Sequence, residues 1–197
     1  MKTEQVRLAA APAQPWRNGG GVTRELLAWP DPADWQVRVS VADIETDGPF
    51  SSFPGVQRWF AVLEGGVTLN IDGREQVCRA GDAPLAFAGD TAVACRRLNG
   101  ASRDLNLMLR DTPGAMQPVV DGDAWAPKAR HCGLYAVQAG RCRAGAADLD
   151  VPAATLLWFA EAPERLTFRA GPPEPGTVPG NVSGWWLAAG AAPGGDA

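Results

Sequence analysis

Turn-forming residues interrupt this chain so often that short strands are favoured over helices. Its 197 residues include 23 glycines and 17 prolines, and the apolar runs between them are short. Short apolar runs bounded by turn dipeptides are typical of β-strands. A chain of this length with 46% hydrophobic residues buries a core without a disulfide or a metal. The sequence therefore predicts an all-β barrel or sandwich.

The charge balance and the N-terminal segment exclude several partners. The net charge is −4 with acids and bases interspersed, which leaves no basic surface for a nucleic-acid backbone. The opening segment MKTEQVRLA lacks the apolar core of a signal peptide, and no window approaches the ~18 apolar residues that span a membrane. We therefore expect a cytoplasmic protein with no nucleic-acid partner and no membrane partner.

The cysteines and the single histidine point away from metal and thiol chemistry. His131 is the only histidine, so a multi-histidine metal centre is excluded and a surface or structural role is expected. The cysteines lack the paired spacing of a disulfide framework or a zinc site, so we expect small buried side chains. They are Cys78, Cys95, Cys132 and Cys142. We expect no metal and no cofactor.

Two alternating segments place polar residues on one face. The segment WQVRVSVADI has valines on one face and polar residues on the other, so one side suits a core and the other a polar lining. The segment DLNLMLR places leucines on one face and Asp104, Asn106 and Met108 on the other. A buried polar group without a partner costs about 1–3 kcal/mol. Asn106 therefore bonds within the protein or serves a ligand, and for Asp104 a structural partner is favoured.

The segment DGPFSSFPGVQR is a loop framed by two turns, and it leads into a strand that begins near Arg58. Turn residues set the backbone direction, so the loop holds its side chains in defined places. One interpretation is that the loop forms the rim of a ligand-binding site and that Ser51 and Phe53 belong to this rim. A tight β-corner with Phe50 and Phe53 in the core is the alternative.

Three consecutive glycines at 19–21 allow a positive φ or the close approach of another segment. In the strand that follows, Arg24 and Glu25 point to opposite faces, so at most one of them faces a given cavity. A glycine bulge with one of these side chains paired across strands is the alternative. Further along, Asp72-Gly73 joins two alternating segments and predicts a two-residue hairpin.

The pattern of polar and apolar residues changes at Thr112. The segments that follow are short and apolar without comparable polar faces, which predicts a second β-unit that packs around Trp158, Trp185 and Trp186. The last residues are of low complexity. The expected parts are a first β-unit with the site at 1–111, a second unit at 112–189 and a disordered tail at 190–197.

Several blocks in one order resemble a known family. They are WRNGGGVTRELLAW, RVSVADIETDGPFSSFPGVQR, LEGG, FAGD and DLNLM, all between residues 16 and 110. In these blocks the chain resembles the HutD/Ves family of bacterial bicupins. The resemblance implies two cupin-like, RmlC-like jelly-roll barrels from one chain, the second degenerate. It also implies a role in histidine utilisation, in which a metabolite such as urocanate or formylglutamate is sensed and the pathway is moderated.

The resemblance also sets the expected site. Metal-dependent cupins use histidines that this chain lacks at the corresponding positions, and Arg58 and Asn106 are the expected polar groups in their place. An arginine fork and amide donors suit a small anionic metabolite, bound without a metal. The backbone at 19–21 offers further donors. The expected ligand-binding residues are Arg58, Asn106, Arg24, Glu25, Ser51, Phe53, Gly20, Gly21 and Met108, and no catalytic residue is expected.

Three functions stay open at this point. The first is the metal-independent sensor just described. The second is a metal-free cupin enzyme, an isomerase or hydrolase with Glu25 or Glu64 as general acid or base, although no second catalytic group is evident. The third is an interaction module or homodimer that uses a tryptophan-rich surface, against which burial in the core is favoured. The tryptophans concerned are Trp29, Trp35 and Trp59.

Overall fold

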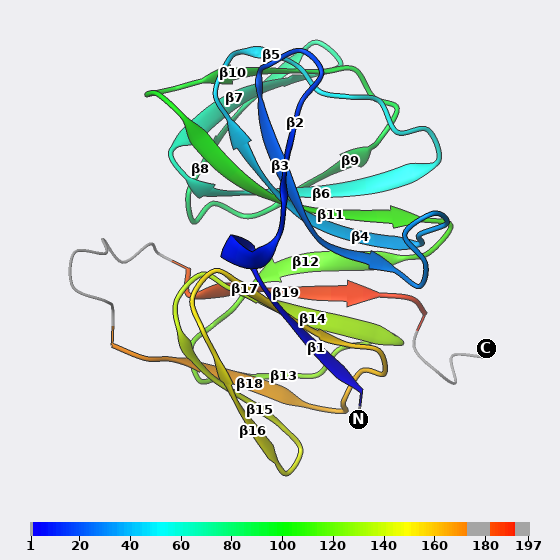
Figure 1. The fold of residues 1–197 in the computed structure, drawn as a ribbon, viewed down its shortest axis with the longest axis vertical. Coiled ribbons are helices and arrows are strands. Elements are labelled where there is room, and N and C mark those ends of the chain that lie inside the picture. The colour runs from blue at the N-terminus through cyan, green and yellow to red at the C-terminus, as the bar shows by residue number, and fades with distance from the viewer. Residues whose placement is uncertain (1, 173–181, 192–197) are drawn as a thin grey trace. The chain divides into compact units, whose positions relative to one another are not determined.

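The computed structural model describes residues 2–172 and 182–191, and its regular structure is almost all β-strand (Figure 1). The helical structure in these residues is one 3-10 turn, η1 (Leu8–Ala10), and none of it is long enough to cross a membrane. The chain divides into two compact units. One is Ala11–Asp111, and the other combines Met1–Ala10 with Thr112–Ala197.

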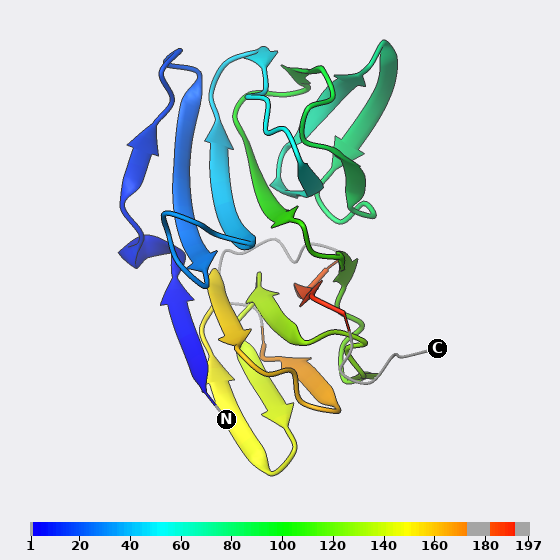
Figure 2. The same cartoon turned by 90° about the vertical axis from the view of Figure 1, so that its right-hand side faces the viewer.

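The first unit consists of two antiparallel sheets. The larger sheet has the order β2 (Ala13–Pro15), β3 (Gly21–Trp29), β4 (Val37–Ile44), β11 (Ser102–Arg110), β6 (Val56–Glu64) and β9 (Leu85–Ala88). The smaller sheet has the order β5 (Gly48–Pro49), β10 (Val93–Arg97), β7 (Gly66–Ile71) and β8 (Arg74–Arg79). Figure 2 shows the early strands of the larger sheet, in blue, side by side.

The second unit repeats this two-sheet plan. Its larger sheet has the order β1 (Thr3–Arg7), β17 (Thr155–Phe159), β14 (His131–Ala136), β19 (Gly184–Ala189) and β12 (Gly114–Pro118). Its smaller sheet has the order β13 (Ala124–Trp125), β18 (Leu166–Ala170), β15 (Gly140–Ala144) and β16 (Ala147–Val151).

Each unit has its own apolar core between its two sheets. In the first unit Phe60 and Val62 of the larger sheet meet Leu69 and Cys95 of the smaller one. In the second unit Trp186 is buried among aliphatic side chains and stacks on Trp125 at 4.8 Å between ring centroids. The predicted all-β fold with two jelly-roll-like units is therefore confirmed. The sheets are open at their edges and do not close into barrels.

The predicted hairpin is also confirmed. Ile71 pairs with Arg74, so Asp72 and Gly73 form a two-residue loop between β7 and β8. Both loop residues have positive φ angles, 48° for Asp72 and 82° for Gly73. This combination defines the type I′ turn that matches the twist of the two strands. The side-chain oxygen of Asn70 also accepts a hydrogen bond from the Gly73 N–H at 2.9 Å.

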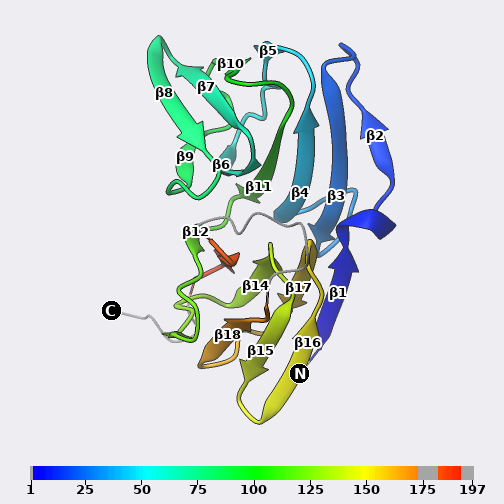
Figure 3. The ribbon, with the colours of Figure 1, turned by 90° about the vertical axis from the view of Figure 1, so that its left-hand side faces the viewer.

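The first ten residues belong to the second unit, which corrects the expected boundary of the first. Strand β1 pairs with β17 from Thr3 opposite Phe159 to Arg7 opposite Thr155, and Figure 3 shows β1 along this edge. The unpaired N–H and C=O groups at the edge of a sheet can pair with a strand from a distant part of the chain. The order of segments in the sequence does not show which edge that is. The expected tail at 190–197 falls mostly on residues 192–197, which lie outside the described residues.

The isolated histidine and the cysteines are structural, as predicted. All four cysteines are buried and free. His131 is buried, its Nδ1 lies 2.5 Å from the carbonyl oxygen of Ala160, and its ring stacks near Trp158 at 6.4 Å. The four cysteines pack in the apolar cores, two in each unit.

Six of the eight tryptophans fall into two groups. Trp158, Trp185 and Trp186 are buried, as predicted. For three more, burial in the core was favoured, and each of them is partly buried. They are Trp29, Trp35 and Trp59. A homodimer that uses them stays a prediction.

We predict that Gly21→Ala destabilises the first unit. A Cβ atom at this position would lie 2.1 Å from the backbone oxygen of Asp43, because β3 and β4 approach closely there. Backbone atoms shift less easily than a flexible side chain, so we expect the free energy of unfolding to fall by about 1–3 kcal/mol. Thermal unfolding measures it. Gly48→Ala is the matched control, since nothing lies within 4 Å of its Cβ position. Equal melting temperatures for the two variants would contradict the close approach.

Candidate functional site

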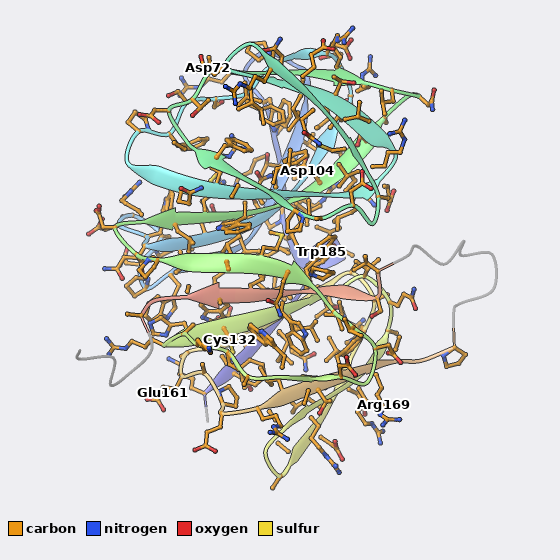
Figure 4. The ribbon with its side chains drawn as sticks, turned by 180° about the vertical axis from the view of Figure 1, so that it is seen from behind. Asp72, Asp104, Cys132, Glu161, Arg169 and Trp185 are labelled. Atoms are coloured by element: carbon orange, nitrogen blue, oxygen red, sulfur yellow. The ribbon has the colours of Figure 1, made fainter. Side chains whose placement is uncertain are left out.

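A polar cavity of about 530 Å³ lies inside the first unit, against the inner face of its larger sheet. Strands β2, β3, β4, β5, β6 and β11 line it, together with loop residues at 16–18 and 50–53. The predicted residues that the structure brings together in its lining are Ser51, Phe53, Arg58, Asn106 and Met108. Asp104, which is labelled in Figure 4 between the sheets of the first unit, lines it as well.

The register of β11 with its two neighbours brings the polar side chains together. Met108 lies between Arg38 on β4 and Arg58 on β6 in one cross-strand row. Asn106 lies in the next row, opposite Ser40. Directly opposite residues of neighbouring strands share a face and are close enough to interact. The alternating residues of three strands therefore make one polar surface.

Arg58 is the buried cation of the cavity. Its side chain is 5% exposed, and its Nη2 donates to Oδ1 of Asn106 at 2.7 Å. The guanidinium carbon lies 5.2, 5.8 and 5.2 Å from the ring centroids of Phe50, Phe53 and Phe87. Burial lowers the pKa of Arg58 to about 10, and the negative charge of Asp104 partly offsets this effect. Arg58 is therefore charged at neutral pH.

One donor of this guanidinium group has no partner. The Nε of Arg58 is buried and makes no hydrogen bond to residues 2–172 or 182–191. An unsatisfied buried donor costs about 1–3 kcal/mol, and more when the group is charged. Arg58 also lines the cavity, so the side chain that carries this buried donor borders the space in which a ligand would lie.

Asn106 connects Arg58 to a buried carboxylate. Its Nδ2 donates to Oδ2 of Asp104 at 2.5 Å, while its Oδ1 accepts from Arg58. Asp104 is 2% exposed. Burial raises the pKa of Asp104 to about 7, against the opposing effects of the Arg58 charge and the Asn106 hydrogen bond. The network therefore contains a carboxyl group that titrates near neutral pH.

An ion pair lies on the same face. The Nε of Arg38 donates to Oε2 of Glu25 at 2.6 Å, and its Nη1 lies 3.6 Å from the sulfur of Met108. Arg38 lines the cavity and Glu25 does not. Glu25 pairs with Ser40 in the β3–β4 register, which puts its side chain on the inner face behind Arg38. Glu25 therefore affects the cavity only by pairing with the charge of Arg38.

Besides Glu25, three more of the expected ligand residues do not line the cavity. Arg24 donates to Asp43 at 2.6 Å and does not line the cavity. Gly20 and Gly21 do not line it either, and their backbones pack against the segment that follows β4 or the end of that strand. The glycine run therefore serves a close approach of backbones, and the expectation that its N–H groups face the ligand stays without support.

Several residues of the cavity were not among the expected ligand residues. For Asp104 a structural partner was favoured, yet it also lines the cavity. Arg38 was noted only as part of a polar face, and that alternation was a usable signal. Trp16 gave no signal, because its place depends on the loop before β3. Phe87 does not line the cavity, but its ring lies near Arg58 because β9 pairs with β6.

The residues that face the cavity do not fit a metal ion. A divalent cation needs several carboxylate, imidazole or thiolate ligands. The polar lining holds guanidinium groups, three amides, hydroxyl groups and the carboxylate of Asp104, which is already bonded. Within residues 2–172 and 182–191 no cluster of three such ligands occurs. The chemistry of this site is therefore that of fixed hydrogen-bond donors and charges.

Two jelly-roll-like units from one chain, with a polar cavity inside the first, define this protein as a bicupin. It belongs to the HutD family, whose family model matches residues 8–169. The resemblance noted in the sequence is thus confirmed. Membership of this family associates the chain with histidine utilisation.

Curated relatives match about half of the chain. One is the "Uncharacterized 21.2 kDa protein in hutC 3'region" of Pseudomonas putida, 42% identical over 102 residues, which are 49% of this chain and 53% of that protein. Another is "Protein Ves" of Citrobacter koseri, 40% identical over 103 residues, or 50% of this chain and 53% of that protein. The matched region spans about half the length of these relatives.

Solved structures match nearly the whole chain. A conserved protein of unknown function from Pseudomonas aeruginosa PAO1 has a TM-score of 0.82 and 29% identity, covering 96% of this chain and 99% of that one. HutD from Pseudomonas fluorescens SBW25, in a structure named for its formate condition, has a TM-score of 0.77 and 24% identity, with the same coverage. The second likeness shows the shared fold.

We predict that Asp104→Asn changes how stability depends on pH. With a folded-state pKa of about 7, raised by burial from 3.8, Asp104 holds its proton in the folded state where the unfolded chain has lost it. The group's contribution to stability therefore falls as the pH rises from about 4 to about 7. The variant lacks this titration, so its melting temperature relative to wild type should be higher at about pH 8 than at about pH 5.

Asp43→Asn is the control for this experiment. Burial alone raises the pKa of Asp43, but hydrogen bonds and charges of Arg103 and Arg24 outweigh that effect and hold it below its ordinary value. Asp43 is thus ionised at both pH values, and its variant should lose the same stability at each. A constant difference between wild type and Asp104→Asn would show that Asp104 does not titrate in this range.

Proposed function

We propose that this protein binds a small anionic metabolite of histidine degradation in the cavity of its first unit, without a metal, and that it thereby moderates the pathway. The metabolite is of the urocanate or formylglutamate class. The role places the protein in the cytoplasm. No catalytic residue is needed for it.

The observation that carries this proposal is the unpartnered Nε of Arg58. A charged donor held out of water inside a sandwich is costly unless a ligand completes its hydrogen bonds. A carboxylate accepts from guanidinium groups in a planar, charge-assisted geometry. Such a bond supplies about 1.5–3 kcal/mol, which is roughly 10- to 150-fold in affinity.

The remaining lining suits a small, flat ligand. A cavity of about 530 Å³ lies in the size range of small-molecule sites, about 300–1,000 Å³. Phe50, Phe53 and Trp16 offer apolar surface next to the donors, while Ser40 and Thr23 offer hydroxyl groups. A conjugated or short-chain acid fits this mixture. The formate condition of the Pseudomonas fluorescens HutD structure suggests formate as the smallest test ligand.

We predict that Arg58→Met abolishes ligand-induced thermal stabilisation. Methionine keeps an unbranched apolar chain among the phenylalanine rings but removes the charge and the donors. In wild type, a ligand at 100 times its dissociation constant adds about 2.7 kcal/mol, a shift of several degrees for a domain of this size. Melting curves with urocanate, formylglutamate, formiminoglutamate, histidine, glutamate and formate measure the shift.

Arg24→Met is the matched control, because Arg24 lies in the same sheet, is paired with Asp43 and does not line the cavity. Its variant should keep the ligand shift from a lower starting temperature. If none of the six compounds moves the wild-type curve, or if Arg58→Met keeps the shift, the proposed site is wrong.

A metal-free enzyme that acts on a related metabolite is the second candidate. The observation that favours it is the Asp104 carboxyl, which lines the cavity with a pKa of about 7 because of burial. General bases work best with a pKa near the operating pH. The carboxylates first considered are less suitable, since Glu25 is bonded to Arg38 and Glu64 to Arg103, and neither lines the cavity.

Mass spectrometry separates the two candidates. As a binding protein, the wild type should leave each of the six compounds unchanged over hours at micromolar protein concentration. Turnover that disappears in Asp104→Asn but persists in Asp43→Asn would establish the enzyme and contradict the sensor as the sole function.

A further inference from the structure

The charged groups inside the cavity are balanced before a ligand enters. Arg38 forms an ion pair with Glu25 at 2.6 Å, and Arg58 is linked through an amide to Asp104. Arg17 also lines the cavity, but its side chain is exposed, where water and salt screen its charge. When Asp104 is ionised these groups carry no net charge, so a carboxylate that binds inside adds an uncompensated negative charge.

The negative charge of the ligand lies next to the hydrogen-bond network that contains Asp104. The unpartnered Nε and the bonded Nη2 belong to the same guanidinium group of Arg58, and Asn106 joins that group to Asp104. Two carboxylates then share one cation in an interior of low dielectric, where like charges repel strongly. In such a pair the pKa of one carboxyl rises until it holds a proton.

Asp104 is the carboxyl that takes the proton. It is 2% exposed, and burial has already raised its pKa to about 7 before any ligand is present. A second negative charge beside it raises that pKa further. Small carboxylic acids ionise near pH 4 in water, so the incoming ligand arrives ionised at neutral pH.

The other groups around this network do not account for such a proton. They are Glu25 on β3, Arg38 and Asp43 on β4, Arg58 on β6 and Cys95 on β10. Burial raises the pKa of the Cys95 thiol to about 12, and burial lowers that of Arg58 only to about 10. Asp43 is held ionised by Arg103 and Arg24. Glu25 accepts from Arg38 and stands outside the lining.

We propose that the cavity binds a carboxylate together with one proton, which comes from solvent and is held on Asp104. This inference rests on the proposed function and adds proton coupling to it. The Asp104 carboxylate and the proton form a carboxylic acid, and no other covalent bond forms or breaks. Protonation also turns Asp104 from an acceptor into a donor. Occupancy of the cavity thus depends on pH as well as on metabolite concentration.

Calorimetric titration of the whole wild-type chain with formate, from about pH 6 to about pH 9, tests the coupling. The dissociation constant should be flat where Asp104 is already protonated and should rise by up to about tenfold per pH unit above about pH 7. Repeating the titration near pH 8.5 in buffers of different ionisation enthalpy should show uptake of about one proton per formate.

Asp104→Asn should bind formate with a constant that does not change over this range. Glu75→Gln removes a carboxylate from an exposed surface pair with Arg96 and should keep the wild-type slope. A flat wild-type curve with measurable binding overturns the coupling and leaves the proposed function standing, as does an unchanged slope in Asp104→Asn. Absence of formate binding at every pH, with formylglutamate and urocanate also inactive, overturns both.

Discussion

A guanidinium group held inside a β-sandwich is the constraint on which the first unit depends. Arg58 is surrounded by three phenylalanine rings, bonded to Asn106 and linked through it to Asp104. A buried charge is tolerated only when it is paired and hydrogen-bonded. The pairing of strands β6 and β11 supplies the hydrogen bond and brings the carboxylate near. Their register places Arg58 beside Met108 and one row from Asn106. The charge and its partners therefore form as one consequence of strand pairing.

This constraint divides the interior of the first unit into two regions. Toward the smaller sheet, Phe60, Leu69 and Cys95 form an ordinary apolar core. Toward β3 and β4 the same sheet carries Arg38 and Ser40 next to the Asn106 row, and the space in front of them is the cavity. The core gives rigidity to the strands, so the donors are fixed before a ligand arrives. Fixed donors limit the entropic cost of binding.

Two groups of the network are held away from their usual states. The Nε of Arg58 lacks an acceptor, and the pKa of Asp104 is raised by burial to about 7. Natural sequences that break local rules of this kind tend to do so at functional sites. The bicupin fold here uses arginine, amide and carboxyl groups where a metal centre would need histidines. In the proposed binding of an anion, charge balance rather than coordination geometry would select the ligand.

The sequence by itself determined the all-β class, the Asp72-Gly73 hairpin, and the polar inner positions of Arg58 and Asn106. These depend on alternation and turn chemistry, which are local properties of the chain. Only the tertiary structure decided that Glu25 rather than Arg24 lies on the cavity side, because the register of β3 against β4 sets the face.

The tertiary structure also decided two features that involve distant segments. The first ten residues complete the sheet of the second unit, since β17 offers a free edge to β1. Asp104 becomes a titrating group of the cavity because β11 lies between β4 and β6, which removes it from water beside Arg58. Both outcomes require pairing between residues far apart in the chain, and alternation within one strand carries no information about its neighbours.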